Sequence, residues 1–143
     1  MLPRFEHLLV PVDFTDKNWL ALDLTFELAV QNKASVTLLH VIEPIAVDDD
    51  PEVAAFMANL ERRALDDLAA MAQRFLDAGA SVEWKTRQGK RAPEIVRFAS
   101  ERAIDLIVLN SHRVNLEELS AESLGSLSHQ VSLFCQCPVL LVK

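Results

Sequence analysis

Glycine is scarce in this chain, and its placement excludes two common nucleotide-binding motifs. The 143 residues contain three glycines, Gly79, Gly89 and Gly125. They lie too far apart to form the G-x-G-x-x-G fingerprint of dinucleotide-binding folds or the G-x-x-x-x-G-K-[ST] sequence of a P-loop. A phosphate-binding loop of either kind is therefore excluded.

Positive charge and long apolar runs are also in short supply. Fourteen Lys and Arg against 21 Asp and Glu leave a formal net charge of −7. A general nucleic-acid binder needs a positive field to displace counterions, so we expect no nucleic-acid partner, although a small anionic ligand needs only a local site. No run approaches the roughly 18–20 apolar residues of a membrane span, and residues 1–6 lack the apolar stretch of a signal peptide. These features predict a cytoplasmic protein with no membrane partner.

The two cysteines, Cys135 and Cys137, form a C-x-C pair near the end of the chain. This spacing differs from the C-x-x-C of redox proteins, and the sequence offers no second ligand pair for zinc. We therefore expect reduced thiols in the core or at an interface, and no metal site.

Apolar runs alternate with helical patterns along the whole chain. Short apolar runs predict buried strands, and apolar residues at helical spacing predict helices that cover them. Strands are expected at 7–12, 34–41, 81–87, 105–109 and 138–142, and helices from Thr15 or Asp16 to Asn32, at 52–78, from Pro93-Glu94 onward and at 124–134. Such alternation requires parallel strands with right-handed crossovers. The predicted fold is α/β, a single doubly wound domain over residues 1–143, with a five-stranded parallel sheet and helices on both faces.

Local signals mark the ends of the long helix and the position of one strand. Asp50 and Pro51 suit the N-cap and first position of the helix at 52–78, and Gly79 suits its end. The strand at 81–87 alternates between apolar and polar residues, which indicates one wet face and a position near an edge of the sheet.

Polar residues gather where the predicted strands end, and in an open parallel sheet ligands bind at those carboxyl ends. Asp13 follows the first strand and either binds a ligand or caps the turn into the next helix. The loop after the fourth strand is the richest in polar groups, with Asn110, Ser111, His112 and Arg113. Gly125 and Ser126 open the last helix, whose free N–H groups favour anions.

Five segments in this order resemble the universal stress protein family over the whole chain. They are Leu-Leu-Val-Pro-Val-Asp-Phe (8–14), Leu-Leu-His-Val (38–41), Asp-Leu-Ile-Val-Leu-Asn-Ser-His (105–112), Leu-Gly-Ser (124–126) and Cys-Pro-Val-Leu-Leu-Val (137–142). The resemblance implies the doubly wound fold, with the final strand at an edge of the sheet.

In the ATP-binding branch of that family, the loop after strand four reads G-x-x-G, nine residues, then G-[ST]. The resemblance places Asp13 and Val41 on the adenine side and Gly125-Ser126 at the final G-[ST]. The first two glycines fall on Asn110 and Arg113, and eleven residues separate Arg113 from Gly125. Because glycine permits positive φ and close approach to phosphate, these changes predict weak or absent binding of ATP or AMP.

The expected function is a nucleotide-responsive stress protein module that acts through partners. Its candidate nucleotide site comprises Pro11, Asp13, Val41, Gly89, Asn110, Ser111, His112, Arg113, Gly125 and Ser126. A ligand-free interaction protein of the same fold is the alternative. A slow nucleotide hydrolase has the least support, because the sequence shows no nucleophile–base pair, carboxylate cluster or Walker lysine, so no catalytic residue is assigned.

The last strand predicts a homodimer. Val139, Leu140, Leu141 and Val142 are all apolar, with only Lys143 after them to discourage pairing. An open apolar edge invites another strand, and the simplest closed arrangement pairs the two final strands antiparallel about a two-fold axis.

Overall fold

The computed structural model describes residues 4–45, 49–111 and 126–143. Strands and helices alternate along the chain: β1 His7–Pro11, α1 Asn18–Asn32, β2 Ser35–Ile42, α2 Pro51–Asp77, β3 Val82–Gln88, α3 Arg91–Glu101, β4 Leu106–Asn110, α5 Leu127–Phe134 and β5 Val139–Val142. All pairings in the sheet are parallel, in the order β3-β2-β1-β4-β5. The predicted doubly wound α/β fold is confirmed, and β3 and β5 form the two edges.

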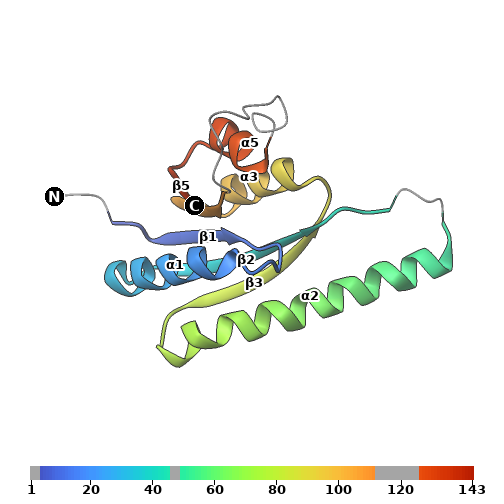
Figure 1. The fold of residues 1–143 in the computed structure, drawn as a ribbon, viewed down its shortest axis with the longest axis horizontal. Coiled ribbons are helices and arrows are strands. Elements are labelled where there is room, and N and C mark those ends of the chain that lie inside the picture. The colour runs from blue at the N-terminus through green and yellow to red at the C-terminus, as the bar shows by residue number, and fades with distance from the viewer. Residues whose placement is uncertain (1–3, 46–48, 112–125) are drawn as a thin grey trace.

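The helices lie in two layers, one on each side of the sheet (Figure 1). α1 packs on β1 and β4, and α2 packs on β2 and β3. α3 and α5 pack against one another on the opposite side. α2 also continues past the end of the sheet (Figure 1). No helix among the described residues is both long enough and apolar enough to cross a membrane.

The central strands are buried on both faces, which explains their unbroken apolar runs. In β1, Leu8 and Val10 point into the core under α1 and α2, whereas Leu9 points into the core under α3 and α5. The fully buried Phe75 anchors the first core, and the fully buried Phe98 anchors the second.

Both ends of α2 follow their local signals. Asp50 is the N-cap, and its carboxylate accepts a hydrogen bond from the Glu52 N–H at 2.9 Å. At the other end Gly79 adopts a φ of 75°. Its N–H donates to the Leu76 carbonyl at 3.0 Å, and the next N–H, of Ala80, donates to the Phe75 carbonyl at 2.9 Å. These two bonds form a Schellman motif, which satisfies carbonyls that the helix leaves free.

The starts of the other helices differ from the prediction. α1 begins at Asn18 behind Lys17, so neither Thr15 nor Asp16 caps it. Thr15 instead donates its N–H and hydroxyl to the Asp13 carboxylate, at 3.0 and 2.7 Å, and forms a turn before the helix.

The last two helices also begin at other residues than expected. α3 begins two residues before Pro93, which the first turn tolerates because N–H groups there lack helical partners. α5 begins at Leu127, with the Ser126 hydroxyl accepting the His129 N–H at 3.3 Å.

The buried ring of Phe98 provides a test of the second core. Arg87 and Arg102 stack over this ring, with guanidinium-to-centroid distances of 5.1 and 5.4 Å. We expect Phe98→Ala to lower the free energy of unfolding by about 3–5 kcal/mol, since it leaves a cavity. Phe56→Ala is the matched control, because that ring is 51% exposed on α2. Urea denaturation measures both variants, and equal losses would contradict this assignment of the core.

Candidate functional site

A crevice lies at the carboxyl ends of β1 and β4. These strands are neighbours in the sheet, but β1 leads to α1 on one face and β4 leads toward α5 on the other, so the chain leaves the two strand ends in opposite directions. The hollow there is small, with a volume of about 40 Å³. It is lined by Pro11, Val12, Asp13, Asn18, Leu39, Val41, Arg91, Ile95, Leu109, Asn110 and Leu127.

Asp13 presents a carboxylate at the mouth of this hollow. Burial raises the pKa of this carboxyl, but the hydrogen bonds from Thr15 and the positive charge of Arg91 outweigh burial, so the pKa lies below its usual value of 3.8. Asp13 is therefore ionised at neutral pH and can accept hydrogen bonds from a ligand.

Asn18 holds the backbone of Asp13 in place. This side chain is 2% exposed, and its Oδ1 accepts the Asp13 N–H at 3.0 Å. The contact ties the first turn of α1 to the end of β1. Sequence reasoning missed Asn18. The available signal was an amide side chain five residues after the strand-end aspartate.

Arg91 brings a positive charge to the same hollow from the first position of α3. It is close enough to Asp13 to lower the pKa of that carboxyl. Sequence reasoning also missed Arg91, although the pair Lys90-Arg91 comes just after β3, separated from it by Gly89 alone. The guanidinium group is suited to bind phosphate or carboxylate oxygens.

Asn110 contributes an unsatisfied donor. Its Nδ2 is buried and finds no acceptor among the described residues. Buried amide groups are nearly always hydrogen-bonded, and leaving one unpaired costs about 1–3 kcal/mol. An acceptor atom on a ligand in this hollow would satisfy Nδ2.

Hydroxyl groups gather beside Asn110 at the start of α5. The Ser128 Oγ lies 3.2 Å from the Oγ of Ser111 and 3.2 Å from the Oγ of Ser126. The backbone N–H of Ser111 donates to the Val142 carbonyl at 2.8 Å, which fixes the end of β4 against β5. This cluster adjoins the first N–H groups of α5, which carry partial positive charge.

The structure brings only part of the predicted site together. Pro11, Asp13, Val41 and Asn110 line the hollow, while Ser111 and Ser126 belong to the neighbouring hydroxyl cluster. Three predicted residues, His112, Arg113 and Gly125, lie outside the described residues. The remaining one, Gly89, does not line the hollow.

Gly89 instead makes a close packing contact with α3. Its φ is 145°, and a Cβ atom built there would lie 2.7 Å from the Cγ of Glu94. Glu94 cannot easily move away, because its carboxylate binds Arg97 at 2.6 Å and lies 4.0 Å from Arg87. The position requires glycine for the approach of the chain to Glu94.

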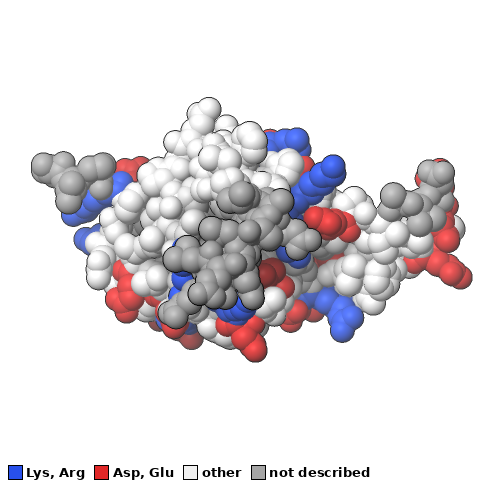
Figure 2. All heavy atoms as spheres, turned by 45° about the horizontal axis from the view of Figure 1, so that its top comes forward, with Lys and Arg blue, Asp and Glu red and all other residues white. Residues whose placement is uncertain are grey.

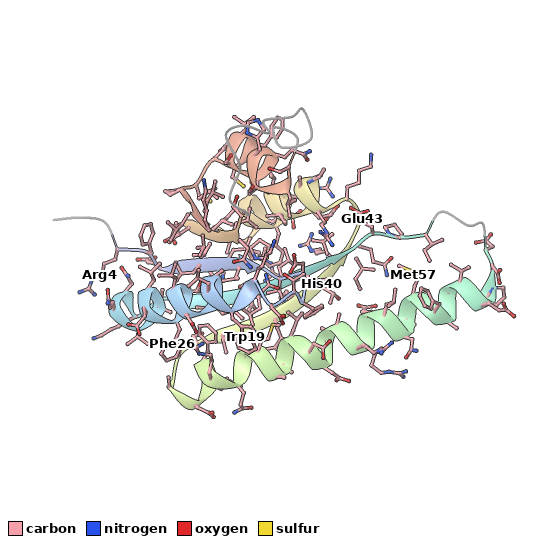
Figure 3. All side chains as sticks on the ribbon, in the orientation of Figure 1. Arg4, Trp19, Phe26, His40, Glu43 and Met57 are labelled. Atoms are coloured by element: carbon pink, nitrogen blue, oxygen red, sulfur yellow. The ribbon has the colours of Figure 1, made fainter. Side chains whose placement is uncertain are left out.

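His40 forms a hydrogen bond with the backbone just after β1. Its Nδ1 lies 2.7 Å from the Val12 carbonyl, so this nitrogen carries the proton and donates. The ring of Phe14 lies over His40 at a centroid distance of 4.5 Å, with Phe14 in a left-handed conformation at φ 62°. His40 lies toward the end of the sheet from which β2 continues to Glu43 (Figure 3). These contacts give His40 a structural role.

Metal-binding side chains do not converge in this region. Within residues 4–45, 49–111 and 126–143, no three His, Cys, Asp or Glu residues lie together as a metal centre would require.

Comparisons with known proteins identify the family and the fold. The sequence model of the universal stress protein family matches residues 4–143. The universal stress protein YxiE of Bacillus subtilis is 30% identical to this chain, over 97% of the chain and 99% of its own length. A universal stress protein in complex with cAMP superposes with a TM-score of 0.71 at 22% identity, covering 99% of this chain and 98% of its own. The universal stress protein from Archaeoglobus fulgidus in complex with dAMP superposes with a TM-score of 0.64 at 20% identity, covering 99% of this chain and 100% of its own.

Substitution of the two described glycines separates backbone strain from close packing. We expect Gly79→Ala to lower the free energy of unfolding by about 1 kcal/mol, because no atom lies within 4 Å of the added Cβ and only the positive φ opposes it. Gly89→Ala should lower it by about 2–4 kcal/mol, since the Cβ also meets Glu94. Urea denaturation measures both, and a Gly89→Ala loss no greater than that of Gly79→Ala would contradict the packing role.

Proposed function

We propose that the protein is a cytoplasmic, nucleotide-responsive binding module that takes an adenine nucleotide weakly in the crevice between β1 and β4 and acts through partners. The chain belongs to the universal stress protein family. Structural neighbours described in complex with cAMP and with dAMP carry ligands that share an adenine ring and one phosphate. These features define the ligand class that we propose for this hollow.

The observation that carries the proposal is the buried Nδ2 of Asn110, which has no acceptor among the described residues. An unpaired donor at the wall of a hollow supports a ligand that brings an acceptor, such as a ring nitrogen or a phosphate oxygen. Two charged groups of the same hollow complement it. The ionised Asp13 accepts hydrogen bonds from ribose hydroxyls or an adenine amino group, and Arg91 favours an anionic phosphate.

Weak binding is proposed because side chains replace the glycines of the ATP-binding branch. At the position of the first glycine, Asn110 carries an amide side chain that lines the hollow. Glycine there would leave backbone N–H groups open to phosphate. Arg113, at the second position, lies outside the described residues. We therefore favour a nucleotide with one phosphate over ATP.

The second candidate is an interaction protein that works as a homodimer without nucleotide, and the edge strand β5 favours it. Among the described residues β5 pairs only with β4, and Leu140 is 38% exposed. On α1, Leu20 and Leu24 are 50% and 39% exposed, and Leu20 shares a hollow with Val142 of β5. The segment 126–142 contains no Asp, Glu, Lys or Arg, and Figure 2 shows a broad uncharged area on the face that carries α3 and α5. A second copy paired along β5 would cover this edge.

Calorimetric titration with AMP, ADP and ATP tests the nucleotide proposal. We expect AMP to bind more tightly than ATP, with dissociation constants well above about 1 μM. Asn110→Leu should weaken AMP binding about 10-fold or more by removing the donor, while the free energy of unfolding without ligand should not fall, because the substitution removes an unpaired buried donor. Leu at position 110 also keeps a similar volume.

Arg91→Gln provides the charge test, with Lys90→Gln as its neighbouring control. Arg91→Gln should weaken AMP about 10-fold and leave adenosine unchanged, whereas Lys90→Gln should change neither. ATP binding at or below about 1 μM would contradict the argument from the lost glycines. If no adenine nucleotide binds at millimolar concentration, the nucleotide proposal fails and the dimeric interaction protein remains.

Light scattering at tens of micromolar tests the dimer. We expect a mass of twice the 16.0 kDa chain, with Val139, Leu140, Leu141 and Val142 at the interface. Leu140→Lys should give a monomer, because a charge at an edge strand discourages pairing. Leu76→Lys on α2 is the control, as Leu76 is also exposed (45%) but lies on a helix that packs on β2 and β3. A stable monomer of the unmodified chain would refute the dimer.

A further inference from the structure

Two thiols lie side by side in the connection between α5 and β5. Cys135 ends α5, and its N–H donates to the Val131 carbonyl at 2.9 Å. After Cys137, the Pro138 carbonyl accepts the Ile107 N–H of β4 at 3.0 Å. The C-x-C segment is thus fixed to the helix at one end and to the sheet at the other. Because the segment is already held in place, it loses less conformational entropy when both sulfur atoms bind a ligand.

Both thiols open into one hollow on the α3 side of the sheet. Its volume is about 320 Å³, and its wall includes the small side chains of Ala99 and Ser100 from α3 and of Ala103 just after it. Each cysteine is partly exposed, and the two thiols are close enough to affect one another's pKa. The hollow is separate from the crevice between β1 and β4, and it shares no lining residue with that crevice.

We propose that Cys135 and Cys137 form a two-thiolate site for a soft monovalent cation of the Cu(I) or Ag(I) class. Thiolates select such ions over hard cations, and two sulfur ligands are enough for a d10 monovalent ion. A site for zinc would need further ligands, and none is grouped here among the described residues. On binding, two S–H bonds break, two S–metal bonds form and two protons leave to solvent. The metal keeps its oxidation state.

The environment of both thiols raises their pKa. Burial raises the pKa of Cys135 to about 11, and the neighbouring Cys137 adds to this rise. Burial also raises the pKa of Cys137, and the charge of Asp105 contributes. A soft cation binds the thiolate form of each cysteine and displaces its proton to solvent.

The test is anaerobic titration of the full chain with Ag(I), which undergoes no redox change here, and then with Cu(I) against a chromophoric chelator. We expect one ion per chain with two protons released per ion. Cys135→Ser and Cys137→Ser should each weaken binding by at least about 100-fold, since losing a ligand costs more than losing one of its supporting contacts. Ser100→Ala changes the same wall without removing sulfur and should stay within about 2-fold.

Two results would overturn the site. If both cysteine variants bound the ion as tightly as the unmodified protein, the ion would lie elsewhere. Failure of the unmodified protein to compete with the chelator would exclude the site. Oxidation to a Cys135–Cys137 disulfide without metal uptake also counts against it. Circular dichroism checks that each serine variant folds. The proton count on the unmodified protein tests the thiol exchange without any variant.

Discussion

Burial of the central strands on both faces is the constraint from which the rest of this structure follows. β1 and β4 are adjacent, parallel and apolar throughout their middle, so helices must cover both sides of the sheet. A right-handed crossover from each strand sends the chain to opposite faces. In the part of the chain that the structure describes, the carboxyl ends of these two strands lead to opposite faces and leave a crevice between them. Asp13 and Asn110 lie there because Asp13 comes two residues after β1 and Asn110 is the last residue of β4.

Most of the fold could be predicted because its signals are local or periodic. Four strands were visible as apolar runs and β3 as an alternation of apolar and polar residues. Both ends of α2 were visible because Asp50, Pro51 and Gly79 act on their own neighbours. The start of α1 could not be predicted in this way. The Asp13 carboxylate engages Thr15, while Asn18 reaches back to the Asp13 N–H, so tertiary placement of the β1 end decides where the helix begins.

The site was only partly visible in the sequence, for the same reason. The rule that ligands bind at strand ends finds Pro11, Asp13, Val41 and Asn110, since these positions depend only on where strands stop. Arg91 and Asn18 come from the first turns of helices, whose side chains reach the crevice only through the crossover geometry. The sequence also assigned Gly89 to the ligand, whereas the close approach that its position requires is to Glu94 within the protein.

The crevice and the open edge share one pair of strands. Asn110 lies opposite Val142 in the β4–β5 register, and the Ser111 N–H donates to the Val142 carbonyl. A ligand that hydrogen-bonds to the Asn110 Nδ2 would contact the end of β4. A second copy that pairs with β5 would contact the strand that is hydrogen-bonded to β4. Any coupling between the two must be reciprocal: if nucleotide tightens the dimer by some factor, the dimer tightens nucleotide by the same factor. The short ladder between β4 and β5, four residue pairs long, is the physical connection through which that coupling would run.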